Sequence, residues 1–174
     1  MNKILHILLV FLFSLTIISC GTDDGGSSST TETTETTAPT VPTVYPTDNQ
    51  SSLSISDNIS VTFSEAMDTT SVTTNTSDTT CSGTFQVSSD SFSTCVQMSS
   101  SPTSSNSDKT FTVDPSDNLS RATTYKIRVT TGVKDSVGNV LGSQYETSNG
   151  FATRDKNFVL AGIANSNVLG STDG

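Results

Sequence analysis

The 174-residue chain has a single histidine, His6, and no tryptophan. His6 lies in a segment that we expect to be removed on export, so the mature chain would have no histidine. This excludes Ser-His-Asp and Cys-His catalysis and histidine-ligated metal sites. Only paired carboxylates such as Asp114 and Asp117 are left for acid–base chemistry, and both lie in an expected turn. The sequence predicts a protein that is not an enzyme and needs no cofactor.

Positive charge is scarce and unevenly placed. Eight Lys and Arg residues stand against 17 Asp and Glu, a formal net charge of -9. After Lys3 the next basic residue is Lys109, and ten carboxylates lie between Asp23 and Asp90. Such a surface repels a polyanion, so we expect no nucleic-acid partner.

Hydrophobic residues are also few, at 32% of the chain, whereas 31 Ser and 31 Thr make up more than a third of it. A chain of this length and composition supports one domain of about 100 to 150 residues, with the rest unpacked. Two domains with separate cores are not expected.

One long apolar run lies near the start of the chain. Met1–Lys3 carries a positive charge, and Ile4–Ile18 is apolar except for three residues. This order is typical of a secretory signal. The run is shorter than the roughly 20 residues of a membrane-spanning helix.

The end of this run contains Ile17-Ile18-Ser19-Cys20-Gly21. It resembles the lipobox of bacterial lipoproteins, which implies cleavage after Ser19 and a lipid on Cys20. The alternative is an ordinary signal peptide with an incidental cysteine. By the same resemblance, Gly21 rather than Asp after the cysteine implies export to an outer membrane. We therefore expect a signal peptide over 1–19 and attachment to a membrane through the lipid.

A polar segment follows Cys20. Gly21–Thr37 consists mainly of Gly, Ser, Thr, Asp and Glu and cannot form a core. We expect residues 20–42 to be a disordered tether.

The remaining cysteines, Cys81 and Cys95, form an even pair in an exported chain. A disulfide is the expected outcome. A simple hairpin centred near Ser88 would place the flanking apolar residues on opposite faces, so we expect a bulge or an irregular stretch between Ser89 and Thr94.

Short apolar alternations recur from about Thr43 to Thr153, separated by turns rich in Asp, Asn, Ser and Gly. No segment has a sustained helical stripe. About seven short strands in some 110 residues is typical of an all-β, immunoglobulin-like sandwich, which we place at 43–153. The expected strands are centred on Leu53 and Ile55, on Ile59, Val61 and Phe63, on Phe85 and Val87, on Val96 and Met98, on Phe111 and Val113, on Tyr125, Ile127 and Val129, and on Phe151.

Three segments within this region carry a resemblance. Thr62–Asp68 reads TFSEAMD, Thr124–Val129 reads TYKIRV, and Val133–Asn139 reads VKDSVGN. Together they resemble the SbsA-type bacterial Ig-like domain, over about Pro42 to Thr153. The resemblance implies an Ig-like sandwich, and the cysteine pair is not part of the family's general pattern.

These motifs have a structural and a functional interpretation. Asp68, Gly138 and Asn139 suit tight turns. In Ig topology the B–C and F–G loops share one end of the sandwich, so Glu65, Asp68, Asp135 and Asn139 would converge there. Their oxygen atoms are ligands of the kind that calcium takes. We favour turn stabilisation and keep a calcium site as the alternative.

The same topology places the tether at one end of the sandwich and the end of the closing strand at the other. Residues 154–174 contain the apolar run Phe158–Ile163, which is interpreted either as a further strand of the sandwich or as the opening of another domain. The function expected is a lipid-anchored structural or adhesive surface module, with host or matrix proteins or glycans as candidate partners. The alternative is a carbohydrate- or calcium-binding accessory module of a larger surface protein.

Overall fold

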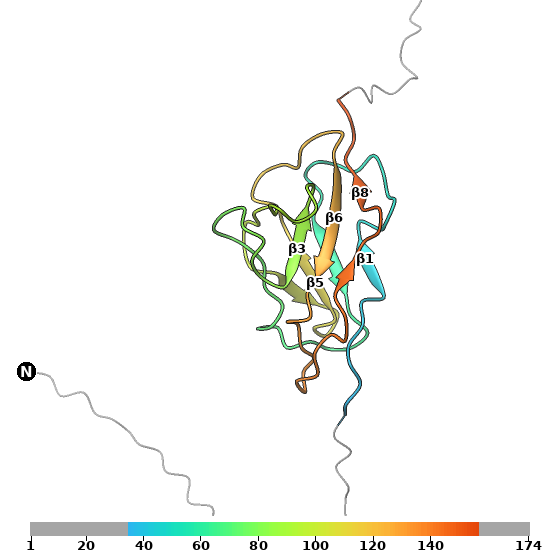
Figure 1. Ribbon diagram of the computed structural model, residues 1–174, viewed down its shortest axis with the longest axis vertical. Coiled ribbons are helices and arrows are strands. Elements are labelled where there is room, and N and C mark those ends of the chain that lie inside the picture. The colour runs from blue at the N-terminus through green and yellow to red at the C-terminus, as the bar shows by residue number, and fades with distance from the viewer. Residues whose placement is uncertain (1–34, 157–174) are drawn as a thin grey trace, which may run out of the picture. The chain divides into compact units, whose positions relative to one another are not determined.

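The computed structural model describes residues 35–156. The expected signal peptide, Cys20, most of the expected tether and the run Phe158–Ile163 lie outside these residues. The described part is built of strands and loops, and it contains no helix that could cross a membrane (Figure 1). Its strands are β1 (Thr43–Tyr45), β2 (Ile59–Thr62), β3 (Phe85–Ser88), β4 (Thr103–Ser105), β5 (Thr110–Val113), β6 (Thr124–Val129), β7 (Tyr145–Glu146) and β8 (Phe151–Ala152).

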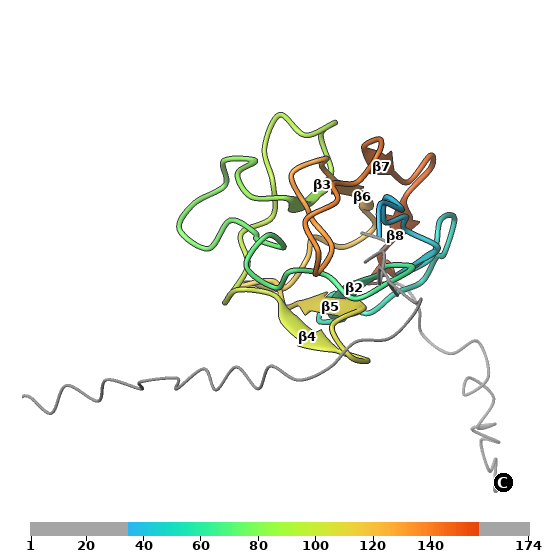
Figure 2. The ribbon, with the colours of Figure 1, turned by 90° about the horizontal axis from the view of Figure 1, so that it is seen from below.

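The strands form two antiparallel sheets that face each other (Figures 1 and 2). One has the order β1-β2-β5-β4, and in the other β6 pairs with β3 on one side and with β7 and β8 on the other. This is the arrangement of a constant-type Ig domain, in which four strands face three. The predicted all-β, Ig-like sandwich is therefore confirmed, with its last strand divided into β7 and β8.

The alternation of side chains explains why these segments are strands. In β6, Tyr125, Ile127 and Val129 are buried, while Lys126 and Arg128 between them are half-buried. A period of two places the apolar half of the strand against the opposite sheet and the polar half in water. The residues that fill the core from both sheets and are almost fully buried include Ile59, Val61, Phe63, Phe85, Val87, Phe111, Val113, Ile127, Val129 and Phe151.

Asp48, which lies in the connection between β1 and β2, fixes the turn that separates β7 from β8. Its Oδ1 accepts the backbone N–H groups of Asn149 at 2.9 Å and Gly150 at 2.6 Å. Gly150 has a φ of 78°, and a Cβ there would lie 2.1 Å from the carbonyl oxygen of Tyr125. Only glycine fits this close approach, so the chain can leave the β6 ladder and return to it.

Two expected strands are wrong. Leu53 is buried but forms only one isolated bridge, to Thr153, and Met98 forms only one, to Pro115. In both segments the side chains enter the core while the backbone runs through loops. Conversely, β1, β4 and β7 were not among the expected strands; the sequence of β4, Thr-Ser-Ser, has no apolar alternation.

The disulfide joins Cys81 to Cys95, as the sequence predicts. It lies beside the outer edge of β3, where Phe85 donates its N–H to the carbonyl of Thr73, and Val87 accepts the N–H of Val96. Unpaired strand edges are sites of aggregation, and loops that cover them prevent it. The disulfide thus links the two loop segments that cover this edge.

The stretch 89–94 between the two cysteines is irregular, as expected from the register of the flanking residues. Ser91 and Phe92 have φ values of 59° and 61°. Asp90 holds the loop: its carboxylate accepts the N–H of Thr94 at 2.9 Å, the hydroxyl of Thr94 at 2.7 Å and the hydroxyl of Ser88 at 2.8 Å. These bonds, led by those from Thr94, lower the pKa of Asp90 to about 2.

We expect Asp90→Asn to lower the melting temperature at pH 7, and we expect the difference to shrink below pH 4 and to disappear only below the folded pKa of about 2. The folded-state pKa lies below the unfolded value near 3.9, so the stabilisation is present above that value and is lost as the pH falls through the folded pKa. Thermal melts of both proteins across this range measure the difference. Asp117→Asn, at an exposed carboxylate, is the control. A pH-independent difference would contradict the account.

Residues 35 and 156 lie at opposite ends of the sandwich (Figure 1). Glu35 lies near the connections that follow β2 and β6, whereas Arg154 donates its N–H to Leu53 beyond the far end of β8. This agrees with the placement expected from Ig topology. A segment that precedes the domain and one that follows it therefore emerge from opposite ends.

Candidate functional site

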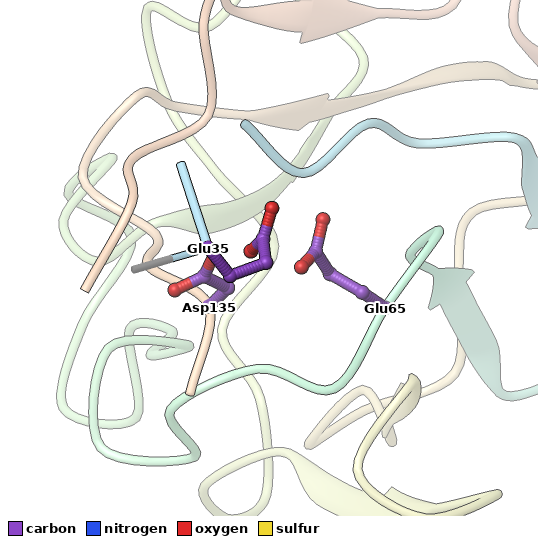
Figure 3. Close-up of side chains that lie close together, drawn as sticks. All are labelled: Glu35, Glu65 and Asp135. Carbon is purple, nitrogen blue, oxygen red and sulfur yellow. The ribbon is translucent and has the colours of Figure 1, made fainter. Parts of the chain in front are cut away.

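Three carboxylates converge at one end of the sandwich (Figure 3). Glu35 precedes β1, Glu65 follows β2, and Asp135 follows β6. One carboxylate oxygen from each lies within 4.8 Å of those of the other two. Backbone contacts bring the connections together, since Asp68 donates its N–H to Lys134 and Ser136 donates to Ala66. We call these three residues the acidic cluster.

Asp135 is the buried member, with 1% of its surface exposed. Its Oδ1 accepts three backbone N–H groups, from Val137 at 2.9 Å, Gly138 at 2.6 Å and Asn139 at 2.8 Å. Burial alone would raise the pKa of Asp135. The hydrogen bonds from Asn139, Val137 and Gly138 together outweigh burial and hold this pKa below its usual value. The carboxylate thus fixes the turn that follows β6.

Asn139 faces the acidic cluster with its amide nitrogen. Nδ2 donates to Asp135 Oδ2 at 2.7 Å, to the carbonyl oxygen of Glu35 at 3.2 Å and to Glu35 Oε2 at 3.3 Å. In this orientation the amide of Asn139 donates hydrogen bonds to the carboxylates of Asp135 and Glu35. The expectation that Asn139 contributes an oxygen ligand is not met by this geometry.

Asp68 does not join the acidic cluster, which corrects the expected set of four. Its Oδ1 accepts the hydroxyl of Thr70 at 2.7 Å and the N–H of Thr70 at 2.9 Å. The hydroxyl bond is the main cause that lowers the pKa of Asp68. Because Thr70 is only two residues ahead in the sequence, these hydrogen bonds hold the carboxylate of Asp68 within its own turn.

Glu65 is half-buried and is the member with the least hydrogen bonding. Its pKa is raised, first by burial and then by the negative charges of Glu35 and Asp135; Lys109 partly opposes this. Lys109 donates its ammonium to the carbonyl of Ser64 at 3.4 Å. The acidic cluster is therefore a site of like-charge repulsion at neutral pH.

We expect Glu65→Gln to stabilise the protein at pH 7, by less than about 1 kcal/mol, as for other partly exposed charges. The folded pKa of Glu65 is raised, so ionisation destabilises the folded state increasingly as the pH rises through that pKa. The gain should vanish as the pH falls below the pKa of glutamate in the unfolded chain, about 4.3, since both states then bind the proton. Urea denaturation at pH 7 and below this pKa measures it, with Asp117→Asn as control. A variant that is less stable at pH 7 would contradict this account.

The other carboxylates considered for catalysis, Asp114 and Asp117, lie after β5 and are exposed. Asp117 is in a bend, in agreement with the expected turn.

In chemical terms, the acidic cluster can hold a proton or a cation.

Glu35 was missed by the sequence analysis because it lies within the segment assigned to the tether. Nothing in the Thr- and Glu-rich surroundings of this residue distinguishes it. The structure shows that the backbone after it already contacts the sandwich: Thr40 donates its N–H to Ser64 Oγ at 3.0 Å, and Ser64 donates its N–H to the carbonyl of Thr40 at 3.0 Å.

Comparison with known proteins gives one family and one group of structures. The family described as "Bacterial Ig-like domain" matches residues 35–153. The structure of the S-layer protein rSbsC(31-844) matches at 24% identity, covering 68% of this chain and 14% of that chain, with a TM-score of 0.47. The structure of the N-terminal part of the bacterial S-layer protein SbsC matches at 23% identity, covering 68% and 24%, with a TM-score of 0.48.

This chain therefore spans less than a quarter of the length of those S-layer proteins, and the likeness concerns the fold. No curated protein matches the sequence. The family match covers more than half of the chain and includes every strand of the sandwich, together with Glu35, Glu65 and Asp135. The chain belongs to the bacterial Ig-like domain family.

Proposed function

We propose that the protein is a lipid-anchored component of the bacterial cell envelope whose Ig-like domain serves as a structural or adhesive surface module. The observation that carries this proposal is the position of residues 35 and 156 at opposite ends of the sandwich. A lipid on Cys20 would attach to the domain through the segment that ends at Glu35. The opposite end would then be directed away from the membrane.

The charge of the domain supports this orientation. The acidic cluster lies at the end that receives the tether, and the positive charge of Lys109 only partly opposes the negative charges around Glu65. Anionic lipid headgroups repel such an end over roughly a Debye length, about 8 to 10 Å at physiological salt. The tethered end would be held away from the membrane surface. The faces of the two sheets and the far end of the sandwich would therefore stay accessible.

The anchor is tested by Cys20→Ser. We expect the unchanged protein in the membrane fraction of its host, since a lipidated cysteine with more than one acyl chain gives persistent attachment. The variant should move to the soluble fraction or retain its signal segment. Equal distribution of the two proteins, with the signal segment removed from both, would contradict the lipid anchor. Cys81 and Cys95 stay unchanged in both proteins, so the folded domain is its own control.

An adhesive role is separated from a passive spacer by direct binding. Residues 21–174, immobilised by an added tag, are screened against arrays of glycans and matrix proteins. Saturable binding to one class that is lost on thermal unfolding supports an adhesive module. An array without saturable binding supports the spacer, and binding to glycans alone supports the carbohydrate-binding alternative.

Calcium binding is the second candidate function, favoured by the convergence of Glu35, Glu65 and Asp135. Three carboxylates within 4.8 Å of one another suit a cation bound at 2.3 to 2.6 Å. Against this, Asp135 and Asn139 already satisfy each other within the turn. Melting temperatures in EDTA and in millimolar calcium test it. A rise with calcium that Glu65→Gln abolishes supports the site, and an unchanged melting temperature contradicts it.

A further inference from the structure

A groove runs along one side of the sandwich, between the segment before β1 and the connection that leads into β7. It has a volume of about 320 Å³, and its apolar lining comes from Ala38, Pro39, Val41, Leu141 and Tyr145. A shallower depression of about 170 Å³ continues it past Val44 towards Asp48. Tyr145 lines both, so the two hollows adjoin at this residue.

The groove lies where both sheets end. β1 is the terminal strand of its sheet and β7 is the terminal strand of the other; within residues 35–156 no further strand pairs with either. The edge of β3 is different, because loops joined by the disulfide cover it. Terminal strands beside an apolar groove offer both backbone hydrogen-bonding groups and side-chain pockets, which are the two elements that recognise an added strand.

The chain itself contains a segment suited to such a groove. Phe158–Ile163, with the sequence FVLAGI, follows the domain and has the length, apolar character and lack of charge of a strand that pairs with an edge. The described chain ends beyond β8, at the end of the sandwich opposite to the segment that leads into β1 (Figure 1). In the sequence only Asn157 separates Lys156 from Phe158. The large part of the groove begins at Ala38, three residues after Glu35. Geometry thus favours the groove of a second copy as the partner of this segment.

Charge complementarity supports the same pairing. Arg154, Asp155 and Lys156 precede the apolar segment and all three are exposed, so this stretch carries a net positive charge. The acidic cluster lies at the end of the sandwich where the groove begins. Opposite charges on two surfaces that approach one another raise the association rate and set the orientation. A basic pair entering beside three carboxylates would orient the segment along the groove.

We propose that Phe158–Ile163 of one copy docks in the groove of a second copy, between its segments 38–45 and 141–145. The contact is head-to-tail, since the donor segment follows the domain at one end of the sandwich and the receiving groove begins at the other. Contacts of this kind do not close on themselves unless the rotation allows a ring, so they generate rows of copies. This inference goes beyond the proposed function and does not depend on the lipid anchor.

Two single variants, each altering one side of the contact, test the proposal in residues 21–174, which lack the lipid. Leu160→Asp places a charge in the donor segment. Gly142→Leu adds an apolar side chain within the groove: Gly142 is exposed, and the nearest atom to an added Cβ there is the Cβ of Ala38 at 3.9 Å, so the backbone position accepts a side chain. Ser101→Leu adds the same side chain at an exposed loop position far along the chain from the groove and serves as control.

Sedimentation velocity over a concentration series measures the association, and thermal melts verify that each variant is folded. We expect the unchanged protein and Ser101→Leu to form oligomers that high salt weakens. Leu160→Asp and Gly142→Leu should each associate at least about tenfold more weakly. Mixing these two variants restores one intact segment and one intact groove, so a discrete 1:1 complex should form.

Other outcomes overturn the proposal. A protein that stays monomeric at all concentrations has no such contact. Association of folded Gly142→Leu equal to that of the unchanged protein would place the contact elsewhere, for example between two apolar segments. A mixture of the two variants that stays monomeric would exclude complementary docking. The lipid-anchor experiment is independent of all three outcomes.

Discussion

Replacing Phe111 by alanine should lower the free energy of unfolding by about 3 to 5 kcal/mol, the usual cost of truncating a large buried aromatic residue. Phe111 is 1% exposed and lies in β5, opposite Val61 of β2. Its ring meets that of Phe63 edge to face, with ring centroids 5.9 Å apart. The loss combines lost burial, lost aromatic contact and a cavity between the sheets.

Urea denaturation of the unchanged protein and of Phe111→Ala measures this loss. Val137→Ala is the matched control, because Val137 is 60% exposed and its truncation should change stability by no more than about 0.5 kcal/mol. The sandwich predicts a large separation between the two variants. Similar effects of both substitutions would mean that the two sheets do not enclose Phe111.

Removing the disulfide with Cys81→Ser and Cys95→Ser together should cost about 3 kcal/mol, the value expected when a crosslink closes a loop of about 15 residues in the unfolded chain. The two cysteines are separated by 14 positions. Reduction of the unchanged protein should produce a comparable loss. Chemical denaturation with and without reductant measures it, and the serine variant should not respond to reductant.

A second effect of this change concerns the edge of β3. Gln86 donates to the carbonyls of Cys81 and Gly83, and Cys95 donates its N–H to Thr79, so the disulfide holds a hydrogen-bonded cover over this edge. Loosening the cover exposes an apolar strand to other chains. Light scattering near the unfolding transition should therefore rise more in the serine variant than in the oxidised protein. Equal stability and scattering of the two would contradict a structural role of the disulfide.

Three of the strands that the sequence predicted correctly, β2, β5 and β6, alternate between buried and partly exposed side chains, whereas β3 is buried along its whole length. β6 is the clearest, because Lys126 and Arg128 alternate with Tyr125, Ile127 and Val129. The alternation fails as a guide where a loop delivers side chains to the core, as at Leu53 and Met98. It also fails for β4, whose Thr and Ser residues carry no apolar alternation although the strand pairs with β5.

The candidate site was predictable only in part, for a related reason. The topology of the fold brings Glu65 and Asp135 to the same end of the sandwich. A sequence that predicts the fold therefore also predicts that these two residues lie close together. The direction of each side chain depends on local hydrogen bonds, which turn Asp68 towards Thr70 and present the nitrogen of Asn139. The position of Glu35 depends on the contact of its segment with the sandwich, and a uniform stretch of Thr and Glu contains no signal for that contact.

The abundance of hydroxyl side chains acquires a structural explanation in the described domain. Thr62 and Thr110, for example, are opposite one another on β2 and β5, and their hydroxyls hydrogen-bond at 3.0 Å. Cross-strand Thr pairs of this kind contribute a few tenths of a kcal/mol each. Thus many Ser and Thr residues form the outer, half-buried face of a β-alternation.

The proposed role is tested most directly by the mass of the protein purified from the membranes of its host. If the protein is a lipid-anchored Ig-like module, intact-mass and peptide analysis will show a chain that begins at Cys20 and carries acyl chains on that residue. The same analysis will show Cys81 and Cys95 joined in the folded domain. A mature chain with an unmodified Cys20, or one cleaved elsewhere so that Cys20 is lost, would contradict the anchored module.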